Sequence, residues 1–163
     1  MENAYHVGMA DLVVVSAPAK LITLGLGSCI GMVIFDSTAK IAGMAHIMLP
    51  DSHGSKSSEK IGKFADIAVP AVIDEIIKKG ASKSRMKAKI AGGAQMFALP
   101  GTPTDFLAVG SRNIKETTAM LAKMNIPLIA SDTGGNKGRT VEFSTITWML
   151  SIKTLGKKET AEI

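Results

Sequence analysis

The hydrophobic period of the chain changes near Glu59, and this change limits the possible folds more than any other feature. Before Glu59, short apolar or β-branched runs are separated by glycine-rich or polar turns, a pattern typical of strands. These runs are residues 12–15, 21–24, 29–35 and 41–49. After Glu59, apolar residues recur every three or four positions over residues 61–77, which predicts an amphipathic helix capped by Gly80. We expect Pro70 to distort the first half of this helix.

The rest of the chain repeats both kinds of pattern. One helix is predicted over residues 112–124. Strands are predicted over residues 86–91, 128–130, 140–143 and 145–152. Many strands with two helices that are separated in sequence indicate a layered α+β fold. The 163 residues fit a single domain, 1–163, that is large enough to bury a core.

Composition excludes several classes of protein. The single cysteine rules out an internal disulfide framework, and no Cys/His cluster has zinc spacing, so no structural metal is expected. The N-terminus lacks a signal-peptide pattern and no apolar window spans a membrane, so we expect a soluble, cytoplasmic protein. The net charge of +5 suits an acidic partner, whereas one Trp, one Tyr and five Phe offer little for nucleic-acid bases to stack on.

Cys29 and His46 lie in consecutive predicted strands. If the connecting turn is centred between Ser37 and Thr38, Cys29 faces His46 directly, with Cβ atoms about 4.5–5.5 Å apart. A loop of odd length would instead move His46 to the opposite face. An imidazole beside a thiol can take its proton and so produce a strong nucleophile.

The residues around Cys29 suit the same chemistry. Gly25, Gly27 and Ser28 can leave backbone N–H groups free to bind an oxyanion, and Thr23 is a candidate to orient the imidazole. Simpler interpretations stay open: the cysteine as a small buried residue and His46 as a histidine satisfied within the core. His6 is expected in a mobile chain end. The glycine loop that starts at residue 132 is a weak phosphate-binding candidate, and a structural turn is favoured.

Several motifs together resemble the chemoreceptor glutamine deamidase family, CheD, from about Val7 to about Lys153. They are TLGLGSC, AGMAHIMLPDS, KFADIAVPAVIDEI, AKIAGGAQMF, GSRNI and SDTGGNKGRTVEF. The resemblance implies a nucleophilic Cys29, a catalytic His46 and Thr23 as the third member of a triad. Backbone donors near Gly27 and Ser28 would bind the oxyanion. The implied fold is a layered α/β sandwich with mixed sheets, similar to glutamine-deamidating toxin domains.

The implied reaction is hydrolysis of glutamine side chains on methyl-accepting chemoreceptors to glutamate and ammonia, through a cysteine thioester and without a metal or organic cofactor. The implied partners are the cytoplasmic helices of the receptors and the phosphatase CheC, with no nucleic acid and no membrane insertion. Two alternatives remain: a non-catalytic adaptor of CheC, and a cysteine hydrolase of another amide. The segment 98–106 is the least family-like part of the chain.

Overall fold

The computed structural model describes residues 2–54, 60–96 and 108–163, so the segment 98–106 lies outside the described residues. Ten strands form two five-stranded sheets in this part of the chain. The first sheet has the order β1 (Asn3–His6), β3 (Ala19–Leu26), β8 (Arg139–Ser144), β9 (Leu150–Thr154) and β10 (Thr160–Glu162). The second has the order β2 (Leu12–Ser16), β5 (Ile41–Ile47), β4 (Ile30–Asp36), β6 (Lys87–Gly92) and β7 (Leu128–Thr133). Both sheets are mixed, because β1 pairs parallel with β3 and β6 with β7.

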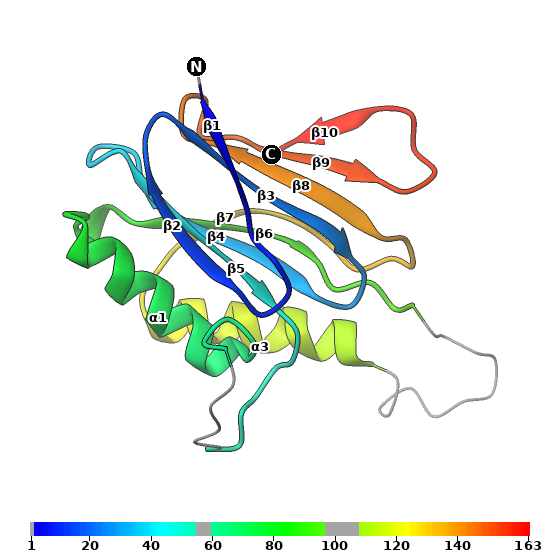
Figure 1. Cartoon of the computed structure of the whole chain (residues 1–163). Coiled ribbons are helices and arrows are strands. Elements are labelled where there is room, and N and C mark those ends of the chain that lie inside the picture. Colours follow the sequence, from blue (N-terminus) through cyan, green and yellow to red (C-terminus); the bar gives the residue numbers. More distant parts are fainter. Residues whose placement is uncertain (1, 55–59, 97–107) are drawn as a thin grey trace.

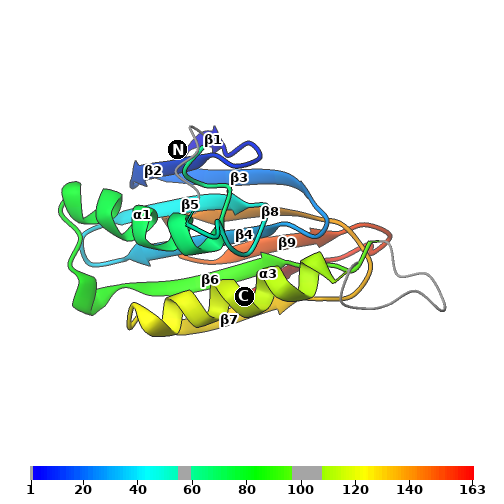
Figure 2. The same ribbon diagram turned by 90° about the horizontal axis from the view of Figure 1, so that it is seen from below.

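The two sheets pack face to face, and both α-helices cover the outer face of the second sheet (Figures 1 and 2). These helices are α1 (Ala65–Lys78) and α3 (Val109–Lys123), and a short 3-10 turn, η1 (Lys83–Arg85), precedes β6. The layered α+β fold with mixed sheets and two main helices is therefore confirmed. Neither helix among the described residues is both long and apolar enough to cross a membrane.

Alternating side chains of β4 supply two separate cores. Ile30, Met32 and Ile34 pack against the helices, whereas Val33 and Phe35 face the first sheet. Strand β4 is buried along its whole length because it lies between a helical layer and a second sheet. This burial explains why its sequence is a continuous apolar run rather than an alternating one.

Several boundaries differ from the prediction. Strand β9 begins at Leu150; residues 145–149 form a turn instead, in which Thr145 hydrogen-bonds through its side chain to both backbone groups of Ala19. Helix α1 begins at Ala65 and continues through Pro70. The placement of His6 in a mobile end is wrong, since His6 belongs to β1 and pairs with Ile22 of β3.

The predicted register of the β4–β5 hairpin is also wrong. The loop has four residues, 37–40, but is centred one position later than expected, so His46 lies opposite Gly31 rather than Cys29. The reason is Asp36, which extends β4 by one residue. Its buried carboxylate accepts the N–H groups of Thr38 and Ala39 and forms a 2.9 Å ion pair with Arg85.

Candidate active site

Three predicted site residues come together at one end of the layer between the sheets. Thr23 lies on β3 of the first sheet, and His46 lies near the end of β5 of the second. Both side chains are buried. Cys29 directly precedes β4 and is partly buried against the same core. The site is therefore assembled from both sheets.

The hydroxyl of Thr23 determines which ring nitrogen of His46 carries the hydrogen. Thr23 Oγ1 lies 2.7 Å from the backbone oxygen of Val7 and 2.7 Å from His46 Nδ1. A peptide carbonyl only accepts, so the single hydroxyl hydrogen is donated to Val7. Oγ1 must then accept from Nδ1–H, which leaves Nε2 as the basic nitrogen. This is the tautomer that a general base requires.

Nε2 of His46 is buried and has no hydrogen-bond partner among the described residues. Cys29 lies two residues before Gly31, the residue opposite His46, and packs against the core between the sheets. Thiol and ring are not hydrogen-bonded to each other. Glycine at position 31 lets Leu26 and Thr23 pack closely against β4, since a Cβ there would lie 3.0 Å from Leu26 and 3.4 Å from Thr23.

Burial keeps both groups neutral at rest. Desolvation raises the pKa of the Cys29 thiol above its ordinary value of 9.0. Desolvation also lowers the pKa of His46 below its ordinary value of 6.5, and the Asp11 carboxylate only partly opposes this effect. At neutral pH the site therefore holds a thiol beside a neutral imidazole, so proton transfer must accompany nucleophilic attack.

The loop before β4 is held through its carbonyl groups. Ala94 N–H donates to the oxygen of Gly27 at 2.9 Å, and Gly93 N–H donates to the oxygen of Cys29 at 2.9 Å. The backbone N–H groups of Ser28 and Cys29 donate to none of the described residues. The carbonyl contacts therefore hold this loop in place. Of the predicted oxyanion donors, Ser28 has a backbone N–H without a partner among the described residues, which leaves this group available to an oxyanion.

Gly92 allows this loop to pack closely. Its φ is +111°, and a Cβ at this position would overlap the carbonyl oxygen of Cys29. Arg139, which is buried, donates to the backbone oxygen of Gly92 and forms a 3.1 Å ion pair with Asp132.

The glycine loop after Asp132 contacts the segment that follows β6, since the oxygen of Gly135 accepts the N–H of Gln95. This loop therefore has a structural contact of its own.

Residues that the sequence analysis did not identify complete the site. The carbonyl of Val7 is one, and it comes from the chain directly after β1, the strand that was missed. Asn113 of α3 is another: it is fully buried and donates to the backbone oxygen of Ser28. In the sequence it is one polar residue of the GSRN motif, and the motif alone does not indicate this contact.

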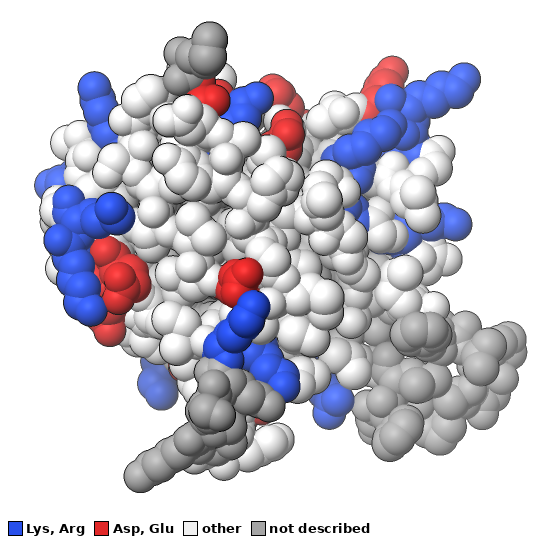
Figure 3. All heavy atoms as spheres, viewed as in Figure 1, with Lys and Arg blue, Asp and Glu red and all other residues white. Residues whose placement is uncertain are grey.

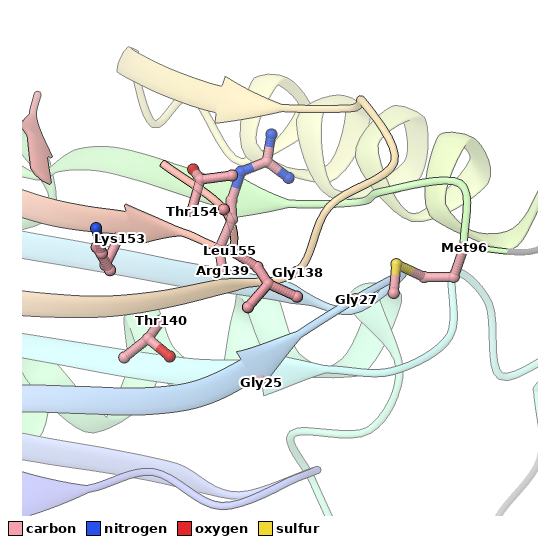
Figure 4. A pocket seen from close by; sticks show the side chains of 10 residues that line it. Gly25, Gly27, Met96, Gly138, Arg139, Thr140, Lys153, Thr154 and Leu155 are labelled. Carbon is pink, nitrogen blue, oxygen red and sulfur yellow. The ribbon is translucent and has the colours of Figure 1, made fainter. Parts of the chain in front are cut away.

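A hollow of about 370 Å³ adjoins the loop on its outer side. Figure 4 shows Leu155 and Met96 on either side of it, with Gly27 between them. Both apolar side chains are exposed, and Lys153 also lines the hollow. No group of three His, Cys, Asp or Glu side chains within the described ranges could hold a metal ion.

A family model and the curated relatives agree on one family. A family model described as CheD chemotactic sensory transduction matches residues 48–154. "Probable chemoreceptor glutamine deamidase CheD" of Clostridium novyi (strain NT) is 49% identical over 155 residues, which cover 95% of each chain. The same name belongs to a protein of Desulfitobacterium hafniense (strain DSM 10664 / DCB-2) that is 47% identical over 98% of each chain.

"Chemoreceptor glutamine deamidase CheD" of Halalkalibacterium halodurans is 45% identical and covers 98% of this chain and 99% of its own. The crystal structure of protein NMB0706 of Neisseria meningitidis covers 82% of this chain and 64% of its own, with 10% identity and a TM-score of 0.47, a likeness too distant to bear on fold or function. The family model spans more than half of the chain and the relatives span nearly all of it, so the chain belongs to the CheD family.

Proposed function

We propose that this protein is a chemoreceptor glutamine deamidase in which Cys29, His46 and Thr23 form the catalytic triad. The observation that carries the proposal is the hydrogen bond from His46 Nδ1 to Thr23, because it leaves Nε2 basic and unpartnered near the only thiol. The names of the curated relatives support the substrate class, glutamine side chains of chemoreceptors.

In the first half of the reaction, His46 Nε2 takes the Cys29 proton as Sγ attacks the carboxamide carbon. The N–H groups of Ser28 and Cys29 are the donors available to the oxyanion of the tetrahedral intermediate. The carbon–nitrogen bond then breaks while Nε2–H donates its proton to the leaving nitrogen, which departs as ammonia. The product on the enzyme is a thioester of Cys29.

In the second half, the same imidazole activates water. His46 Nε2 takes a proton from water as its oxygen attacks the thioester carbon, and the oxyanion again faces the loop N–H groups. The carbon–sulfur bond breaks, the proton returns to Sγ, and glutamate is released. Thr23 maintains the ring orientation throughout, because its own hydrogen stays with the Val7 carbonyl.

The surface beside the loop favours a protein substrate over a small amide. The hollow next to Gly27 presents the exposed side chains of Leu155 and Met96, which suit the apolar face of a helix. Basic side chains lie at the β9–β10 connection, where Lys157 and Lys158 are exposed (Figure 3). This charge suits an acidic receptor helix, and each deamidation adds one negative charge to such a helix.

The alternative role is an adaptor that binds the phosphatase CheC without catalysis. A chain with that role alone would not need the Thr23–His46 hydrogen bond or unpaired N–H groups at Cys29. Deamidation and CheC binding are also compatible within one protein, and we propose both, with CheC binding resting on the family resemblance.

The deciding experiment is mass spectrometry of a purified chemoreceptor cytoplasmic fragment incubated with the wild-type protein or with Cys29→Ala. The wild type is expected to convert specific glutamines to glutamate and to release ammonia, whereas Cys29→Ala does neither. Cys29→Ala must also show a wild-type melting temperature, since the change removes little volume. No conversion by the wild type, together with intact stimulation of CheC, would establish the adaptor role instead.

A further inference from the structure

The β4–β5 ladder ends just before the candidate nucleophile. Its last pair is Ile30 with Ile47, so the residues beyond this pair are not joined by the ladder. Cys29 lies immediately on one side of this point, and His46 lies one residue inside it on the other. The distance between the Cys29 thiol and the His46 imidazole therefore depends on contacts that hold the two chains in place beyond the end of the ladder.

One side chain bridges the two chains. Asn113 Nδ2 donates to the backbone oxygen of Ser28 at 2.9 Å and to the backbone oxygen of Met48 at 3.0 Å. Ser28 directly precedes Cys29, and Met48 follows His46 by two residues. Because both partners are carbonyl oxygens, the group that faces them must be the amide NH₂. One NH₂ group therefore links the chain that carries Cys29 to the chain that carries His46.

The bridge is rigid for two reasons. Asn113 is fully buried, so water does not compete for its hydrogen bonds. The first turn of helix α3 also closely approaches the segment after β6, because a Cβ at Gly110 would overlap the backbone oxygens of Ala94 and Gly93. This segment in turn donates hydrogen bonds to the loop before β4. This close approach brings the short asparagine side chain within reach of both carbonyls.

We propose that Asn113 is a positioning residue that sets the separation of Cys29 Sγ from His46 Nε2 by bridging the backbones of Ser28 and Met48. The inference rests on the proposed function, in which these two atoms exchange a proton. The residue itself does not touch the reacting groups. It acts by extending the connection between β4 and β5 beyond the end of their ladder.

The test compares Asn113→Leu with Thr117→Val. Leucine has the same number and branching of side-chain heavy atoms as asparagine but no hydrogen-bond donors. Thr117 lies one turn along the same helix and is equally buried, and its hydroxyl has no hydrogen-bond partner among the described residues. It therefore controls for a change within the helix packing. We expect Asn113→Leu to lower kcat by about tenfold to 100-fold with KM nearly unchanged, because small displacements of reacting groups have effects of this size. Thr117→Val should keep the wild-type kcat.

Alkylation of Cys29 by iodoacetamide gives a second readout that needs no receptor substrate. We expect Asn113→Leu to shift the pH of half-maximal alkylation upward, toward that of His46→Ala, because the imidazole no longer assists the thiol. The proposal would be overturned if the pH dependence of alkylation in Asn113→Leu equalled that of the wild type. It would also be overturned if Thr117→Val lost as much kcat as Asn113→Leu. If Asn113→Leu does not fold, Asn113→Ala serves for the same measurements.

These two readouts also separate this inference from the proposed function. A wild-type protein that leaves receptor glutamines unchanged would refute the deamidase, whereas the alkylation comparison would still decide whether Asn113 couples the thiol to the imidazole.

Discussion

Thr23 Oγ1 lies 2.7 Å from His46 Nδ1, and this hydrogen bond joins the two sheets at the candidate active site. Thr23 belongs to the first sheet and His46 to the second. The carbonyl of Val7, directly after β1, takes the hydroxyl hydrogen and so makes Thr23 an acceptor. The basicity of His46 Nε2 therefore depends on a strand that pairs with neither Cys29 nor His46.

Replacement of Thr23 by valine tests this dependence. The change keeps the shape but removes the acceptor, so the ring can place its hydrogen on Nε2, where it no longer acts as a base. We expect kcat/KM to fall by about 100-fold and the free energy of unfolding to fall by about 1–3 kcal/mol, since buried polar groups lose their partner. Thr23→Ser retains the hydroxyl and should keep most of the activity. Equal activity of Thr23→Val and wild type would remove Thr23 from the mechanism.

The pH dependence of kcat/KM should show a plateau with widely separated limbs. The proposed mechanism needs a neutral His46 and a protonated Cys29. Burial lowers the pKa of His46, so the acid limb should lie below its ordinary value of 6.5. Burial raises the pKa of Cys29, so the alkaline limb should lie above 9.0. A thiol that is already alkylated at its maximal rate at acidic pH would instead indicate a resting thiolate–imidazolium pair.

Gly92→Ala should inactivate the protein through backbone packing alone. Its Cβ would overlap the Cys29 carbonyl oxygen and displace the loop that carries this proposed nucleophile. Gly135→Ala is the matched control: its φ is also positive, at +71°, but a Cβ there meets nothing within 4 Å. Both variants should lose about 1–2 kcal/mol to backbone strain, whereas only Gly92→Ala should lose activity in the deamidation assay. Similar activities in the two variants would contradict the role assigned to this contact.

Local patterns in the sequence predicted much of the fold. The change of period near Glu59 separates strands from helix because helical and strand periods differ, and this difference needs no tertiary information. The candidate residues Thr23, Cys29 and His46 were also identified, since their residue types and motifs suggest one chemistry. The structure brings Thr23 and His46 into direct contact.

The remaining features depend on contacts between distant residues. The register of the β4–β5 hairpin follows from the ion pair of Asp36 with Arg85, which lies 49 positions away. Strand β1 is fully exposed and forms only by pairing with β3, so its own sequence carries little apolar signal. Asn113 reaches Ser28 across 85 positions, and no local pattern indicates such a contact.

Leu155 offers a test of how the substrate binds. Its side chain is 71% exposed at the edge of the hollow beside Gly27, where a receptor helix would cover it. We expect Leu155→Ala to raise KM for a receptor fragment by about tenfold, the effect of losing roughly 1.4 kcal/mol of apolar burial, with kcat unchanged. Ile146→Ala is the control, because Ile146 is 58% exposed and lines a different hollow, beside Pro18, which directly precedes β3. Steady-state kinetics of both variants decide the matter: equal KM values would place the receptor on another surface, whereas a selective rise in Leu155→Ala would place it across the loop that carries Cys29.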